Sequence, residues 1–188
     1  MNEYRESDHT YWMFGGEVPG VTTILKAAGL YNESFFTEES RNRGTYIHKA
    51  CLYHLQGDLA EENIPEEYRG YVEAFKLFMA ESECKPIVEQ CEVPLFSNVF
   101  RYAGIPDMPC MFKGRMSLVD FKTGAETPVT GIQLAAYVQL MDTPADRYGL
   151  YLKADGKYRL IPYCDRKDLA VFNAALTMYH FRKREGLL

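Results

Sequence analysis

Two aspartates and a lysine in the middle of the chain have the types and spacing of a metal-dependent hydrolytic site. Asp107 ends the segment GIPD (104–107), and the segment DFK (120–122) follows it. In a strand, side chains two residues apart share a face, so Asp120 and Lys122 point the same way while Phe121 turns into the core. Two carboxylates suit Mg²⁺ or Mn²⁺, which prefer oxygen ligands. A cation of this kind, with a positioned water, hydrolyses phosphodiesters, and this is the chemistry that the spacing favours.

The surroundings of Asp120 and Lys122 decide whether they belong to a metal site or form an ordinary surface ion pair. An isolated Asp-x-Lys is most often a solvent-exposed pair on an edge strand. Here Glu92 falls on the preceding predicted strand, and Asp120 ends an apolar run. Three carboxylates on adjacent strands are costly unless a cation neutralises them, which favours a metal site. Lys122 could hold the attacking water as hydroxide or stabilise charge on the phosphate, and the sequence leaves both open.

Five short motifs in series resemble the RecB-like branch of the PD-(D/E)XK nucleases. The family signature is a helical GxxxH, a Glu on the first strand, GxxD, DxK and a helical QxxxY. This chain has GTYIH (44–48), Glu92, GIPD (104–107), DFK (120–122) and QLAAY (133–137), in that order. Each motif is weak alone, but five in order are specific. The resemblance covers about 45–137, and 18–25 is also similar to phage-type members.

The resemblance implies a fold and a set of site residues. The fold is α/β, a PD-(D/E)XK restriction-endonuclease-like core with a central mixed sheet of about five strands flanked by helices. The implied metal ligands are His48, Asp107, Asp120 and the Phe121 carbonyl; the implied catalytic residues are Lys122, Asp107, Asp120 and Glu92, with Glu92 supporting the site; the implied substrate-binding residues are Gln133 and Tyr137. Gln133 and Tyr137 share a helix face one turn apart and would brace the site. Taken alone, His48 would more often be an ordinary core or surface histidine, and Gln133 and Tyr137 ordinary helix residues.

The expected cofactor is Mg²⁺ or Mn²⁺, without an iron-sulfur cluster. Several relatives hold such a cluster with one Cys before the core and three near the C-terminus, whereas only Cys164 lies beyond the core here. The five cysteines, an odd number with no CxxC pair, fit neither a disulfide framework nor a zinc ribbon. We expect them to be reduced core residues; they are Cys51, Cys84, Cys91, Cys110 and Cys164.

Basic and aromatic residues near the motifs are candidates for contact with DNA. The basic ones are Arg41, Arg43, Lys49, Arg101, Lys113 and Arg115. Arg41 and Arg43 are preferred because they lie within two turns of His48 and arginine pairs well with phosphate. The aromatic ones, Tyr11, Trp12 and Phe14, could stack on bases, but a core role is favoured. The net charge of -5 argues only against a histone-like positive coat.

Composition and length predict one globular domain over 1–188. Hydrophobic residues are 47% and charged residues 25% of the 188 residues. We expect a helical part at about 18–83, a sheet core at about 86–164 and a last helix at about 165–186. No apolar run suits a membrane span and the N-terminus lacks the pattern of a signal peptide, so the expected location is the cytoplasm, that of a host if a phage encodes the protein.

Hydrophobic periodicity predicts the helices that carry or support the motifs. A short helix stops at Gly29, a helix over 38–56 carries His48 and ends at Gly57, and an amphipathic helix follows Pro65 over 66–81. A helix over 129–141 follows the polar loop 123–128. Asp165 is expected to cap the last helix, which ends near Gly186.

Period-two patterns predict the strands. One strand begins at Pro86, continues to Leu95 and carries Glu92. Strands over 102–108 and 115–122 flank a turn at 113–114. Strands over 148–154 and 157–163 flank Asp155 and Gly156, a pair typical of a tight hairpin.

These features together predict a Mg²⁺- or Mn²⁺-dependent deoxyribonuclease, by family analogy an exonuclease in phage-type DNA recombination, repair or processing. Two alternatives stay open: a catalytically silent nucleic-acid-binding or scaffold protein on the same fold, and an endonuclease or nickase. The intact Asp107, Asp120 and Lys122 disfavour the silent alternative. The expected partner is DNA, with a homo-oligomer or a recombination partner protein open and no membrane.

Overall fold

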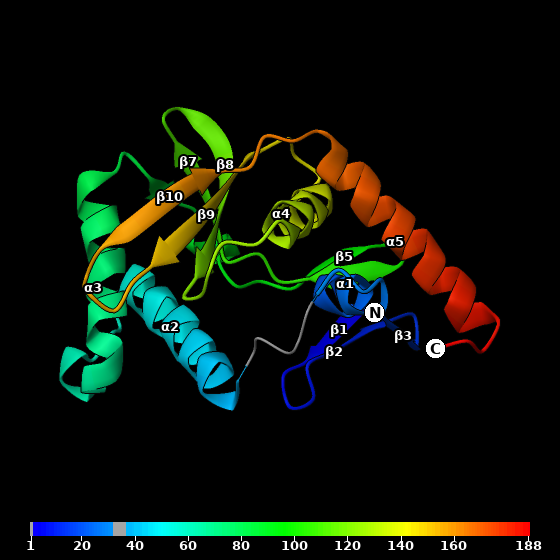
Figure 1. Cartoon of the computed structure of the whole chain (residues 1–188), viewed down its shortest axis with the longest axis horizontal. Helices are drawn as coiled ribbons and strands as arrows, with labels where there is room; N and C mark the ends of the chain where they lie inside the picture. The colour runs from blue at the N-terminus through cyan, green and yellow to red at the C-terminus, as the bar shows by residue number, and fades with distance from the viewer. Residues whose placement is uncertain (1, 32–36) are drawn as a thin grey trace.

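A five-stranded mixed sheet forms the centre of the molecule (Figure 1). The computed structural model describes residues 2–31 and 37–188. The strand order is β10-β9-β8-β7-β4, and β8 and β9 are the parallel pair. The bounds are β4 Lys85–Pro86, β7 Met108–Phe112, β8 Arg115–Lys122, β9 Asp146–Leu152 and β10 Tyr158–Pro162. The α/β prediction with a mixed sheet of about five strands is confirmed.

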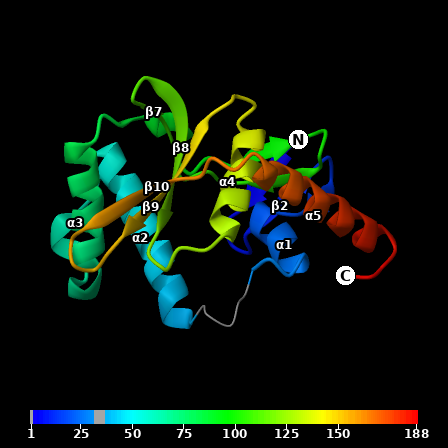
Figure 2. The same ribbon diagram turned by 45° about the horizontal axis from the view of Figure 1, so that its top comes forward.

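Helices cover both faces of this sheet (Figures 1 and 2). The helices α2 (Glu38–Gln56) and α3 (Glu66–Glu81) pack on one face. The helices α1 (Val21–Ala27), α4 (Val129–Leu140) and α5 (Lys167–Arg184) pack on the other. All five agree with the predicted helices. The N-cap residue of α5 is Arg166 and not the expected Asp165, although the Asp165 side chain accepts the Lys167 N–H at 2.8 Å. Within the described ranges, none of the helices has the length and apolar character needed to span a membrane.

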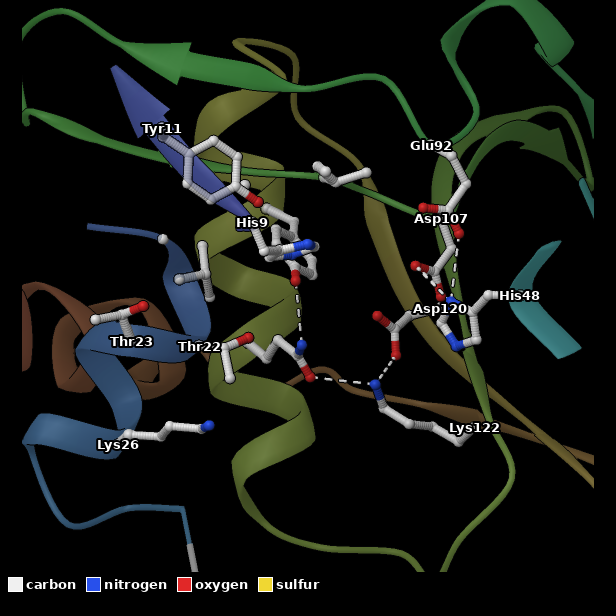
Figure 3. A pocket seen from close by; sticks show the side chains of 16 residues that line it. His9, Tyr11, Thr22, Thr23, Lys26, His48, Glu92, Asp107, Asp120 and Lys122 are labelled. Carbon is white, nitrogen blue, oxygen red and sulfur yellow. Dashed lines mark hydrogen bonds and ion pairs between the residues drawn. The ribbon is translucent and has the colours of Figure 1, made fainter. Parts of the chain in front are cut away.

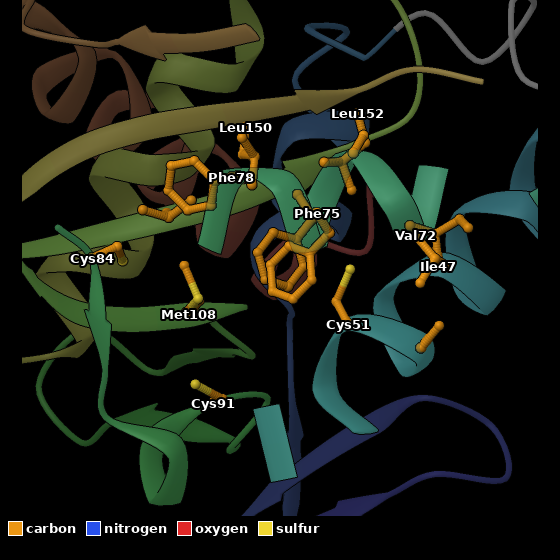
Figure 4. Close-up of a cluster of buried hydrophobic side chains, with 14 of the residues drawn as sticks. Ile47, Cys51, Val72, Phe75, Phe78, Cys84, Cys91, Met108, Leu150 and Leu152 are labelled. Atoms are coloured by element: carbon orange, nitrogen blue, oxygen red, sulfur yellow. The ribbon is translucent and has the colours of Figure 1, made fainter. Parts of the chain in front are cut away.

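Strand β8 separates two hydrophobic cores because its side chains alternate between the faces of the sheet. Val119 and Phe121 belong to the core under α2 and α3, where Phe75 packs against the Phe121 ring at 5.1 Å between centroids. Figure 4 shows Phe75 and Phe78 among the side chains of this core. Leu118 belongs to the core under α4 and α5. Asp120 and Lys122 share the face of Leu118, so they point toward α4.

Two small sheets lie beside the α4 face. One contains β1 (Asn2–Arg5), β2 (Thr10–Met13) and β3 (Gly16–Val18); the other contains β5 (Leu95–Ser97) and β6 (Tyr102–Gly104). A third apolar cluster, which includes Tyr11, Met13 and Ala103, joins the two sheets. Sequence patterns did not predict the N-terminal sheet, because strands this short carry little periodicity.

Two predicted strands are wrong. The segment from Pro86 to Leu95 is not continuous: after β4 it makes a 3-10 turn (Val88–Gln90) and a bend at Glu92, whose φ of 54° is outside the strand region. The Glu92 N–H donates to the carbonyls of Pro106 and Asp107 at 3.0 and 3.2 Å, which fixes this bend. The predicted strand over 102–108 is divided between β6, which belongs to a separate two-stranded sheet, and β7 of the central sheet, with Pro106 in the gap between them.

Four of the five cysteines are buried and all five are free thiols, as predicted for Cys51, Cys84, Cys91 and Cys110. The core prediction is wrong for Cys164, which is exposed just after β10. Its position between the last strand and α5 leaves it outside both main cores.

Two helical glycines should respond in opposite ways to replacement by alanine, although helix propensity favours alanine at both. A Cβ at Gly70 on α3 would lie 1.8 Å from the Ala154 carbonyl oxygen, whereas a Cβ at Gly44 on α2 would have open space. We expect Gly44→Ala to stabilise the fold by about 0.5–1 kcal/mol. We expect Gly70→Ala to destabilise it by about 1–3 kcal/mol, because the backbone must shift. Urea unfolding of both variants measures the two effects, and an equal gain from both would contradict the close contact.

Candidate metal and active site

The end of β8 presents a carboxylate and an ammonium to the same cavity. The Lys122 Nζ forms an ion pair with Asp120 and donates to Gln133 Oε1 at 3.2 Å (Figure 3). Gln133 Nε2 in turn donates to the Tyr137 hydroxyl at 3.1 Å. Because Gln133 and Tyr137 are one turn apart on α4, the helix holds the lysine from the side opposite its own strand.

Gly104 on β6 makes room for this chain of contacts. A Cβ at position 104 would lie 2.7 Å from Tyr137 Cε1 and 3.1 Å from Leu140 Cδ1. Real Cβ atoms do not approach another atom as closely as the distance to Tyr137, so any larger residue would displace the Tyr137 ring. The glycine of GIPD and the tyrosine of QLAAY are therefore packing partners.

A second cluster of polar side chains adjoins the Asp120–Lys122 pair. His48 on α2 places its Nδ1 at 3.3 Å from Glu92 Oε1 and 3.4 Å from Asp107 Oδ1. Its Nε2 lies 3.0 Å from the Phe121 carbonyl oxygen. Asp107 Oδ2 accepts the Phe121 N–H at 2.6 Å. The cluster thus joins α2, the bend before β5, the start of β7 and the backbone of β8.

Opposite charges set the protonation of this cluster. Burial would lower the pKa of His48, but the carboxylates of Asp107 and Glu92 outweigh it and raise that pKa well above its usual value. Burial would raise the pKa of Asp107, but His48, Lys122 and the Phe121 N–H lower it. The pKa of Glu92 is raised, by burial first and then by the charge of Asp107.

The strand pair shows the same balance. Burial raises the pKa of Asp120 to about 6, with Lys122 opposing and Asp107 adding to the shift. Burial would lower the pKa of Lys122, but Asp120 and Asp107 hold it above its usual value. The lysine therefore stays positively charged near neutral pH, in a place where the local charge is otherwise negative.

The donor atoms fit a divalent cation. One ligand atom each from His48, Glu92 and Asp107 lies within 4.8 Å of the others, so this group could bind a metal ion. Oxygen donors with one imidazole suit Mg²⁺ or Mn²⁺. Two predicted ligands lie beside this three-residue group and are not members of it. Asp120 forms an ion pair with Lys122, and the Phe121 carbonyl oxygen faces the His48 imidazole. Glu92, expected as a supporting residue, itself offers one of the three candidate ligand atoms.

A cavity of about 440 Å³ contains both clusters and residues that the motifs did not include. Besides the motif residues it is lined by His9, Tyr11, Thr22, Thr23 and Lys26. Figure 3 shows these side chains on the wall opposite Asp107, Asp120 and Lys122. Nothing in the sequence indicates His9 or Lys26, Tyr11 is a candidate there only as an aromatic that could stack on bases, and Thr22 and Thr23 fall only in the 18–25 segment that resembles phage-type members. The N-terminal sheet and α1 bring all five to the site through tertiary contacts.

Comparisons with known proteins find distant similarity to solved structures. No family model matches the chain, and no curated protein matches its sequence. Among solved structures, one named a candidate exonuclease, from Eubacterium rectale, is 12% identical with a TM-score of 0.48, and the match covers 88% of this chain and 74% of that chain. The protein SSO0001 is 14% identical with a TM-score of 0.38, and the match covers 85% of this chain and 84% of that chain. At these values neither similarity bears on activity.

The arginines preferred for DNA contact do not line this cavity. Arg41 is exposed near the start of α2. The Arg43 guanidinium lies 5.6 Å from the centroid of the Tyr71 ring on α3, so it faces the helix pair. Its Nε is buried and has no hydrogen-bond partner within 2–31 and 37–188. A role for either arginine in DNA binding stays a prediction and would place the substrate along the start of α2.

The remaining candidate contacts are engaged with the protein itself. Lys49 pairs with Glu6 at 3.7 Å, and Arg115 pairs with Asp146 at 3.0 Å. Arg101 lies over the Phe14 ring at 5.7 Å, and Lys113 over the Phe112 ring at 5.2 Å. Of the three aromatic candidates, Tyr11 is buried, Trp12 half-buried and Phe14 67% exposed, so the favoured core role applies to Tyr11 and not to Phe14.

Proposed function

We propose that the chain is a Mg²⁺- or Mn²⁺-dependent deoxyribonuclease. The observation that carries this proposal is the convergence, in one cavity, of the His48, Glu92 and Asp107 group with the Asp120–Lys122 pair. A carboxylate-rich group that could hold a metal ion, beside a charged lysine, is an arrangement that can catalyse phosphodiester hydrolysis. The five motifs that resemble the RecB-like nucleases supply most of the residues in this cavity.

The proposed roles follow from the contacts. His48, Asp107, Asp120 and the Phe121 carbonyl, with Glu92 beside them, would hold the cation. When bound, the cation would lower the pKa of a water and neutralise charge on the phosphate. Lys122, fixed by Gln133, would orient the attacking water or stabilise the charge on the phosphate oxygens. Tyr137 would keep Gln133 in place.

The finer proposal is an exonuclease in phage-type DNA recombination, repair or processing, acting in the cytoplasm. It is supported by the resemblance in motif order and spacing. An endonuclease or nickase would use the same residues, so the topology of the substrate must separate the two.

The test is to incubate the protein with end-labelled linear DNA, single- and double-stranded, and with covalently closed circular DNA, in Mg²⁺, Mn²⁺ or EDTA. We expect metal-dependent loss of linear DNA and an intact circle. Cleavage of the circle would make the protein an endonuclease. No degradation of any DNA with either metal would contradict the nuclease proposal and favour the silent binding or scaffold alternative.

A further inference from the structure

Two cavities share lining residues at the group of His48, Glu92 and Asp107, called the metal-binding group, and the two cavities together are called the groove. The second cavity, of about 570 Å³, also has His48 in its lining, together with Thr45, Leu52 and Pro94. Four residues line both cavities: His9, His48, Glu92 and Ile105. A chain molecule could therefore enter through one cavity, pass the metal-binding group and continue into the other.

The turn between β1 and β2 forms one wall of this groove at the junction. His9, on that turn, has a φ of 56°, a conformation uncommon for residues other than glycine. Its Nδ1 lies 2.7 Å from the Tyr4 hydroxyl. The Tyr4 ring packs on Tyr11 at 5.1 Å, and Tyr11 packs on Phe96 at 6.0 Å. The imidazole is thus anchored through aromatic contacts to the β5–β6 sheet.

This anchoring orients the imidazole toward the groove. When the Tyr4 hydroxyl donates to Nδ1, the His9 proton is on Nε2, which becomes a hydrogen-bond donor. Figure 3 shows His9 between Tyr11 and the metal-binding side of the cavity. The Thr22 and Thr23 side chains line the same cavity and offer hydroxyl donors. Donors of this type can bind phosphate oxygens on the wall that faces the carboxylates.

A contact across the second cavity limits what can lie in it. Glu6 on the turn and Lys49 on α2, both lining this cavity, form an ion pair at 3.7 Å. The pair connects the hairpin to the helix beside the groove. Because it is solvent-exposed, it is weak enough to open when a strand enters. Because the Glu6 and Lys49 side chains meet across this cavity, an occupant must be thin enough to enter when this one ion pair opens, which favours one strand over a duplex.

We propose that this groove binds a single DNA strand across the metal-binding group, and that His9 donates from Nε2 to a backbone phosphate of that strand. The proposal rests on the nuclease function proposed above and names its substrate form. His9 is a substrate-binding residue in this view, and Tyr4 is a positioning residue that acts through it.

The test measures DNA binding separately from cleavage. A fluorescent single-stranded oligonucleotide is titrated by anisotropy, with Mn²⁺, against proteins that carry Lys122→Ala so that the probe stays intact. In this background we expect His9→Ala to weaken binding about tenfold, since a hydrogen bond to a charged group is lost. His9→Gln, which keeps an N–H donor, should recover most of the affinity. Ser7→Ala is the matched control, because Ser7 is exposed on the same turn and lines neither cavity.

Each outcome has a distinct meaning. Equal affinities for His9→Ala and Ser7→Ala would overturn the proposal, as would a blunt duplex that binds as tightly as the single strand or the absence of DNA binding. As a control, thermal stabilisation by Mn²⁺ should be the same in His9→Ala as in the parent protein. That result would show that the fold and the metal-binding group are intact. If the protein with Lys122 intact cuts no DNA, while His9→Ala weakens the binding of single strands, the nuclease proposal fails and the groove proposal stands.

Discussion

Replacing Lys122 with alanine should lower the rate of DNA cleavage by about two to four orders of magnitude. The ammonium is the positive side chain that contacts Asp120, and Gln133 fixes its position. Alanine removes the group that would orient the water or stabilise the phosphate charge and leaves the group of His48, Glu92 and Asp107 in place. The measurement is the single-turnover rate on end-labelled DNA with saturating Mn²⁺.

A lysine elsewhere on the same β hairpin provides the control. Lys113 lies at the turn between β7 and β8, with its ammonium over the Phe112 ring and away from the cavity. Lys113→Ala should therefore cleave at nearly the rate of the unmodified protein. If Lys122→Ala also keeps that rate, the lysine has no catalytic role and the proposed mechanism is wrong.

Replacing Asp107 with asparagine should abolish stabilisation of the fold by Mn²⁺. For a ligand present at about 100 times its Kd, stabilisation is about 2.7 kcal/mol, which corresponds to a Tm rise of roughly 5–10 °C for a chain of this size. Asparagine can still accept the Phe121 N–H through its carbonyl oxygen, so the fold should persist. The negative charge that faces His48 and the cation is lost, and the Tm should become the same in Mn²⁺ and in EDTA.

Thermal unfolding of Asp146→Asn supplies the comparison for this charge loss. Asp146 pairs with the exposed Arg115 and does not line the cavity, so its variant should keep the full Tm rise. A Tm rise of normal size in Asp107→Asn would show that the cation, if one binds, uses other ligands.

The sequence predicted the elements whose patterns are long. The helices α2 to α5 and the strand β8 have enough periodic residues to fix their bounds within a few positions, and the alternation along β8 placed Asp120 and Lys122 on one face. The placement of His48 came from the motif series rather than from periodicity. Its role as a ligand stays a prediction.

Other parts of the site depend on contacts that no local pattern records. Glu92 reaches His48 from a bend held by the carbonyls of Pro106 and Asp107, although alternation of residue types indicated a strand there. His9 reaches the cavity because Tyr11 fixes the N-terminal sheet on β5 and β6. Both positions are set by tertiary packing, which outweighs local preference in segments this short.

The close approach of Gly104 to Tyr137 has an evolutionary consequence. The missing side chain at 104 and the ring at 137 fill one volume, and through Gln133 that volume fixes where Lys122 lies. A mutation that enlarges position 104 would be tolerated only together with a smaller residue at 137. In proteins that share this arrangement, the residues at positions 104 and 137 should therefore covary. Where the glycine at 104 is replaced, the residue at 137 should also differ from tyrosine.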